Sequence, residues 1–137
     1  MLIETVDKYY NKEIYDLNCA ETMIYAGNEE YDMHLNQDTL KTMAAFGGGM
    51  AIESVCGAIT GSLAIIGILF TKGQAHESDK VKLLTIEFID KFKNKLNTIN
   101  CRELKGKYKT EDIRCSVMMN SAGEILDYII KREKKLL

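Results

Sequence analysis

A run of 18 residues without a charged side chain, Ser54–Thr71, constrains the fold of this chain more than any other feature. A helix built from this run would be apolar on every face, because its residues are mainly Gly, Ala, Ser, Thr, Ile and Leu. Such a helix must be surrounded, either by lipid or by other helices of the same protein. The run therefore predicts a membrane span or the centre of a helical bundle.

The bundle is the better interpretation. A span needs roughly 17–25 apolar residues, so this run is at the short end, and its many small residues keep the hydropathy modest. The following segment, 79–99, carries an apolar stripe at helical spacing that needs a partner to cover it. The stripe consists of Val81, Leu84, Phe88, Phe92 and Leu96. We therefore expect no membrane span and a buried helix over residues 53–71.

The rest of the chain also favours helices. It contains no proline to interrupt them, and no segment alternates with a period of two. Asn18 and Glu21 form a capping-box pattern, so a helix should begin at Cys19. Further helices are expected over 1–11, after a cap at Asp38, and over 116–132. In the last of these, the residues expected to face the core are Met118, Ala122, Ile125 and Ile129. The residues expected to face water are Asn120, Glu124, Asp127 and Lys131. The sequence predicts an all-α, single-domain helical bundle over 1–137 with a buried glycine-rich central helix.

The three glycines Gly47, Gly48 and Gly49 precede the central helix. A phosphate-binding loop would need a following Gly-Lys-Ser/Thr, and no lysine is present. We expect these glycines to form a tight corner between helices.

The net charge of −2 argues against nucleic-acid binding. The first residues lack the pattern of a secretory leader, so we expect a cytoplasmic protein with reduced thiols. A homodimer is expected, because Gly57 and Gly61 would permit close helix pairing and much apolar surface needs covering.

The four cysteines are the candidate functional residues: Cys19, Cys56, Cys101 and Cys115. None forms a C-x-x-C pair, and cysteines often serve as small core residues. However, all four lie at the ends of expected elements, and helix ends can converge in a bundle. Cys19 and Cys56 start helices, where the helix dipole would lower a thiol pKa. Cys101 and Cys115 flank a basic connector whose cations (Arg102, Lys105, Lys107, Lys109 and Arg114) would favour a thiolate or an anionic cluster.

The order of these motifs resembles the C_GCAxxG_C_C family of redox-active proteins. The matching segments are "NCAE" at 18–21, "FGGG" at 46–49, "CGAITG" at 56–61, "CREL" at 101–104 and the last cysteine, Cys115. The Cys-Gly-Ala-x-x-Gly core is matched by Cys56, Gly57, Ala58 and Gly61. The resemblance covers nearly the whole chain, although the connector between the last two cysteines is unusually basic.

The resemblance implies a prokaryotic redox or electron-transfer protein, often encoded near transporters. A related domain holds an iron–sulfur cluster, so Cys19, Cys56, Cys101 and Cys115 are expected as metal and cofactor ligands of such a cluster. Zinc is the alternative metal. If no metal binds, the same cysteines would act as redox thiols, with Cys19 or Cys56 as the attacking thiol. A non-catalytic binding module associated with a transporter also remains open, and the redox partner is not identified.

Four other side chains are weaker candidates. His34 and His76 lie in polar connectors, where an exposed histidine is usually only surface, so we expect neither to take part. Glu53 could relay a proton to Cys56, but the dipole of the expected helix explains an acidic residue in its first turn more simply. Thr60 could donate to the Cys56 sulfur, but its hydroxyl is expected to bond within its own helix.

Overall fold

The computed structural model describes residues 1–136, and within them it is an all-α protein with one continuous apolar core. The α-helices are α1 (Leu2–Tyr9), α2 (Cys19–Glu30), α3 (Gln37–Leu40), α4 (Gly57–Phe70), α5 (Lys80–Leu96), α6 (Cys101–Tyr108) and α7 (Ser116–Lys135). Short 3-10 or irregular turns cover Lys41–Ala45, Gly49–Glu53 and Ala75–Glu77. The all-α prediction is confirmed.

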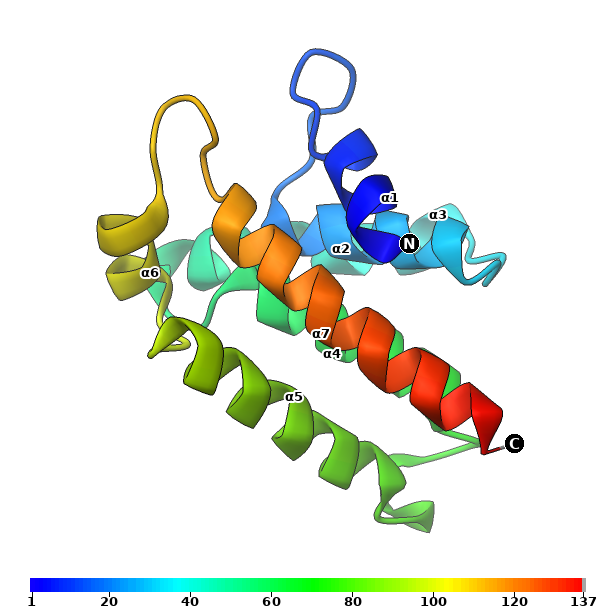
Figure 1. Cartoon of the computed structure of the whole chain (residues 1–137). Helices are drawn as coiled ribbons and strands as arrows, with labels where there is room; N and C mark the ends of the chain where they lie inside the picture. Colours follow the sequence, from blue (N-terminus) through cyan, green and yellow to red (C-terminus); the bar gives the residue numbers. More distant parts are fainter. Residues whose placement is uncertain (137) are drawn as a thin grey trace.

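Helix α4 is the central helix of the bundle, as predicted. It packs against α2, α5 and α7, and Figure 1 shows α7 crossing it while α5 runs along another side. Ile59, Ile65 and Ile66 are fully buried, and Ile68 is the only exposed residue of the helix. No helix within residues 1–136 has both the length and the apolar character needed to cross a bilayer.

The amphipathic helices on either side of α4 bury the predicted stripes. In α5 the buried residues are Leu84, Phe88, Phe92 and Leu96, and in α7 they include Met118, Ala122, Ile125 and Ile129.

The prediction that Asp127 faces water is wrong. Asp127 is only 5% exposed. Its carboxylate accepts a hydrogen bond of 2.8 Å from the Tyr31 hydroxyl and pairs with Lys131 at 2.8 Å. These partners satisfy the charge that burial would otherwise penalise. Asn120 is half-buried rather than fully exposed.

Two predicted helix starts are wrong. The helix after residue 35 is capped by Asn36, whose side chain accepts from the Thr39 N–H at 2.8 Å, and not by Asp38. The central helix begins at Gly57 rather than at Glu53. Residues 54–56 are instead held by an isolated antiparallel bridge between Val55 and Asn100. This bridge satisfies backbone groups that the first turn of a longer helix would have used.

The glycines of the central helix make a close contact inside the chain. A Cβ atom at Gly61 would lie 2.6 Å from the Ala20 carbonyl oxygen, and one at Gly57 would lie 3.1 Å from the Cys19 Cβ. A side chain at Gly61 would force the backbone apart, and one at Gly57 would be tight, so the N-terminal parts of α2 and α4 pack closely against each other. This face is therefore buried within one chain and does not support the predicted dimer, which stays a prediction.

Candidate functional site: a cavity lined by four cysteines

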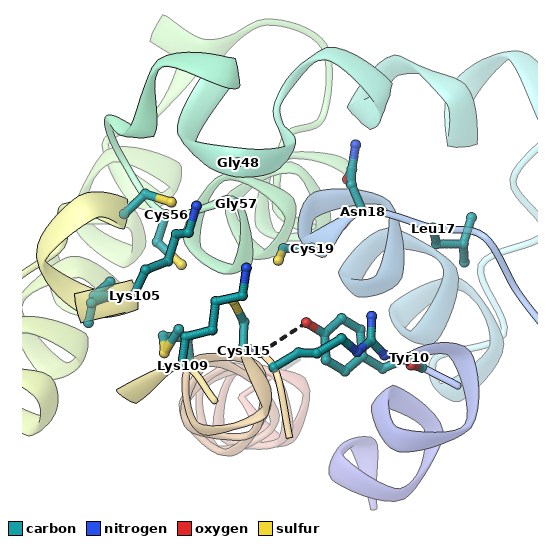
Figure 2. Close-up of a pocket in the computed structure, with 14 residues that line it drawn as sticks. Tyr10, Leu17, Asn18, Cys19, Gly48, Cys56, Gly57, Lys105, Lys109 and Cys115 are labelled. Carbon is teal, nitrogen blue, oxygen red and sulfur yellow. Dashed lines mark hydrogen bonds between the residues drawn. The ribbon is translucent and has the colours of Figure 1, made fainter. Parts of the chain in front are cut away.

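The four cysteines lie at the N-terminal ends of four different helices. Cys19 is the first residue of α2 and Cys101 the first of α6, while Cys56 and Cys115 are the N-cap residues of α4 and α7. These ends surround one cavity of about 230 Å³, which all four cysteines line and which we call the cysteine cavity (Figure 2). The other lining residues are Tyr10, Leu17, Asn18, Gly48, Gly57, Leu104, Lys105, Lys109, Arg114 and Met118.

The position of Cys19 follows from the predicted capping box. The Asn18 side chain accepts from the Glu21 N–H at 2.8 Å, and the Glu21 carboxylate accepts from the Asn18 N–H at 3.1 Å. The Asn18 amide also donates to the Ala44 carbonyl at 2.9 Å. A Cβ at Gly47 would lie 2.3 Å from the Asn18 side chain, so only glycine allows the Asn18 side chain to lie against the backbone at this position. The cap thus fixes the start of α2 against the glycine corner.

Cys56 and Cys101 are brought together by backbone pairing. The Cys56 N–H donates to the Ile99 carbonyl at 2.9 Å, and the Cys101 N–H donates to the Ser54 carbonyl at 2.5 Å. Both side chains are buried, at 5% and 6% exposure. Gly49, in the left-handed region at φ 65°, lies beside this pairing, where a Cβ would be 2.8 Å from the Cys101 Cβ. The start of α4 and the start of α6 are therefore locked side by side.

Cys115 is held by Tyr10, a residue that the sequence did not indicate for the site. The Cys115 N–H donates to the Tyr10 hydroxyl oxygen at 3.1 Å. The Arg114 guanidinium lies 3.9 Å from the Tyr10 ring centroid and donates to the Tyr10 backbone carbonyl. Residues about 100 positions apart in the sequence thus form one unit. No local pattern around Tyr10 could have revealed it, because the contact is entirely tertiary.

Cys19 and Cys115 differ in acidity because their side chains interact within the cavity. The interaction with the Cys19 side chain lowers the pKa of Cys115 to about 6. Burial opposes this shift, while Lys109, Tyr10 and Lys105 support it. The interaction with Cys115, together with burial, raises the pKa of Cys19 far above its usual range. The two shifts have opposite directions, so Cys115 is the more acidic thiol of the pair.

Burial disfavours the thiolate form of the other two cysteines. Burial raises the pKa of Cys56 to about 12, although the N–H groups of Ala58 and Ile59 favour its thiolate. Burial also raises the pKa of Cys101. The prediction that the helix dipole lowers the pKa of Cys19 and Cys56 is therefore wrong. Desolvation of a buried charge outweighs the partial charge of a helix end.

The weaker candidates lie away from the cavity or use their groups elsewhere. His34 is exposed and lies 3.1 Å from Asp32, and His76 is also exposed. The Thr60 hydroxyl donates to the Gly57 carbonyl at 3.2 Å, as expected. Glu53 does not lie in the first turn of a helix, and it pairs instead with Arg102 at 3.6 Å and Lys105 at 3.2 Å on α6.

The arrangement of the thiols bears on which metal they fit. Across residues 1–136, no group of three or more His, Cys, Asp or Glu side chains is arranged to hold one metal ion. The donor chemistry of four cysteines on one cavity matches the usual ligand set of an iron–sulfur cluster. In such a cluster the thiolates bind different iron atoms and need not meet at one point.

Comparison with known proteins supports the redox interpretation. Searches of curated proteins and of solved structures gave no match. A family model described as "Putative redox-active protein (C_GCAxxG_C_C)" matches residues 17–129. The matched range includes all four cysteines of the cavity and most of the chain. The chain therefore belongs to the C_GCAxxG_C_C family.

Proposed function

We propose that the protein is a thiol–disulfide redox protein in which Cys115 is the attacking thiolate and Cys19 the resolving thiol. The observation that carries this proposal is the placement of Cys19 and Cys115 on one cavity, where the pKa of Cys115 is lowered. Attack on a disulfide requires a thiolate, and Cys115 has the lowered pKa. This assignment differs from the sequence-based one, which favoured Cys19 or Cys56 for attack.

The reaction proceeds in two displacement steps. The Cys115 thiolate attacks one sulfur of a substrate disulfide, the substrate S–S bond breaks, and one substrate thiolate leaves and takes up a proton from solvent. Cys19 then loses its proton to solvent and attacks the Cys115 sulfur of the mixed disulfide. The second substrate thiol leaves, and a Cys19–Cys115 disulfide forms. Two electrons pass from the two protein thiols to the substrate, which becomes two thiols.

The neighbours of Cys115 support the thiolate without taking part in bond changes. Lys109 and Lys105 contribute positive charge, and Tyr10 holds Cys115 in place through its hydroxyl oxygen, which accepts from the Cys115 N–H at 3.1 Å. Tyr10 is therefore a positioning residue. Cys56 and Cys101 are buried, which disfavours their thiolate forms and keeps them unreactive while the first pair cycles.

The test is to oxidise the reduced, metal-free protein with one equivalent of a small disulfide and to map the bridges by peptide mass analysis. We expect the loss of two thiols and a Cys19–Cys115 bridge. Cys115→Ser should prevent any reaction, and Cys19→Ser should stop at the mixed disulfide. Cys56→Ser is the matched control and should still form the bridge. Four unreactive thiols, or a bridge between Cys56 and Cys101, would rule out the proposal.

An iron–sulfur cluster is the second candidate, favoured by the placement of all four thiols on one cavity next to Lys105 and Lys109. Cys19, Cys56, Cys101 and Cys115 would hold the cluster, which supplies one-electron transfer when bound. Protein purified without oxygen should then be brown and contain iron and acid-labile sulfide. Colourless, iron-free protein from anaerobically grown cells would exclude this candidate.

A further inference from the structure

We propose that the cysteine cavity binds a small anion between Lys105 and Lys109, so that the preferred substrate of Cys115 is a small disulfide with a negative group close to its S–S bond. This inference rests on the thiol function proposed above and adds the chemical class of the substrate. It is carried by the direction of the two lysines, the charges around them and the size of the cavity.

The two lysines point into the cavity. Figure 2 shows the ammonium ends of Lys105 and Lys109 extending into the space among the labelled Cys19, Cys56 and Cys115. Lys105 comes from α6, and Lys109 is the residue that follows this helix. Two like charges directed at one small space repel each other unless an anion lies near both. A bound anion would remove this repulsion.

The charges around the cavity leave a positive surplus. Three cationic residues line it, Lys105, Lys109 and Arg114. Glu53 pairs with Lys105 at 3.2 Å and with Arg102 at 3.6 Å, but within residues 1–136 no carboxylate lies in ion-pair distance of Lys109. The residues that line the cavity therefore include three cationic side chains and no carboxylate. The charge left over suits a ligand with at least one negative group.

The size of the cavity limits the ligand. Its volume of about 230 Å³ is below the roughly 300–1,000 Å³ of pockets for drug-sized molecules. A small carboxylate-bearing disulfide presents a negative group to the lysines and a sulfur to Cys115.

The first experiment compares the alkylation rates of Cys115 in metal-free protein by iodoacetate, an anion, and by iodoacetamide, its neutral counterpart. Both reagents displace iodide from the same type of carbon, so the thiolate fraction affects both rates equally. The ratio of the two rates therefore reports only the charge around the sulfur. We expect the ratio to exceed that of the denatured protein by about tenfold at low salt and to fall as salt is added.

Matched lysine variants show which charges are responsible. Lys109→Gln and Lys105→Gln should each lower the ratio several-fold. Lys107→Gln is the control, because Lys107 is on the same helix as Lys105 but does not line the cavity, and it should leave the ratio unchanged. Lys107 and Lys109 are exposed, and Lys105 is partly exposed, so circular dichroism is expected to show folded variants.

A second experiment uses disulfides directly. Dithiodiglycolate, which carries a carboxylate near each sulfur, should oxidise the protein faster than the neutral 2-hydroxyethyl disulfide, and Lys109→Gln should abolish the preference. A ratio equal to that of denatured protein, with Cys115 still reacting first, would overturn the anion site and leave the thiol function standing. If Cys115 does not react first with either reagent, the thiol function itself fails, and the anion inference fails with it.

Discussion

Adding one methyl group at position 61 tests the close contact that positions the site. A Cβ at Gly61 would lie 2.6 Å from the Ala20 carbonyl oxygen and 2.9 Å from the Met23 Cβ. The nearest atom belongs to the backbone, so α2 and α4 must move apart. Overpacking of this kind costs about 1–3 kcal/mol, whereas replacing glycine by alanine in a helix interior gains about 1 kcal/mol. Gly61→Ala combines both effects.

Gly67→Ala is the matched control on the same helix. A Cβ at Gly67 meets no atom within 4 Å, so this variant keeps only the gain in helix propensity. The stability difference between the two variants therefore isolates the overpacking cost, about 1–3 kcal/mol. For a chain of 137 residues, 1 kcal/mol corresponds to a Tm change of about 3–4 °C. We expect Gly61→Ala to melt about 4–10 °C below Gly67→Ala, measured by circular dichroism under reducing conditions.

The same substitution should also affect the rate of disulfide formation. The contact at Gly61 and Gly57 places the start of α2, with Cys19, against the start of α4. Gly61→Ala should therefore slow the formation of the Cys19–Cys115 bridge, while Gly67→Ala should not. Equal melting temperatures for the two variants would show that α2 and α4 are not in backbone contact, and the account of the motif glycines would then be refuted.

Four further predictions concern the acidity of Cys115 and the oligomeric state. The alkylation rate of Cys115 by iodoacetamide should rise as the pH increases through about 6 and then level off, because its thiolate forms there, whereas denatured protein should titrate near the usual thiol pKa of about 8.5. Tyr10→Phe removes the hydroxyl that accepts from the Cys115 N–H and lowers the pKa of Cys115, so the midpoint of this profile should move to higher pH; an unchanged midpoint would contradict the role of Tyr10. Cys19→Ala should raise the midpoint more than Cys19→Ser, because serine keeps a donor hydroxyl, and ultraviolet absorbance of the thiolate measures both. Light scattering should give the mass of a homodimer, and a mass near 15.5 kDa at micromolar concentration would contradict it.

Local patterns in the sequence were enough to predict most of the fold. The stripes of α5 and α7 and the capping box at Asn18 depend on residues within a few positions of one another, and the structure confirms them. The buried position of α4 followed from its lack of charge. The position of Asp127 could not be predicted, because its hydrogen-bond partner, Tyr31, is 96 residues away.

The candidate site was predictable as a set of residues but not as a set of roles. The four cysteines were singled out by their positions at helix ends and by the family resemblance. Which of them carries the thiolate depends on tertiary neighbours. The side chains of Cys19, Tyr10 and Lys109 lower the pKa of Cys115, while burial in the core raises the pKa of Cys56. A rule based on helix ends alone treats the two positions alike, so it cannot distinguish them.

The corner after the three glycines shows why the start of α4 was misplaced. Met50, Ala51 and Glu53 have φ values of 61°, 64° and 57°, in the left-handed region that such residues rarely adopt. No local preference predicts this, so tertiary contacts must hold the corner. The Ser54 N–H donates to the Gly49 carbonyl at 2.9 Å, and Glu53 reaches Lys105 on α6. The strained corner thereby connects the start of α4 to α6, the helix that carries Cys101 and Lys105. A regular helix from residue 53 would lose the contact between Glu53 and Lys105.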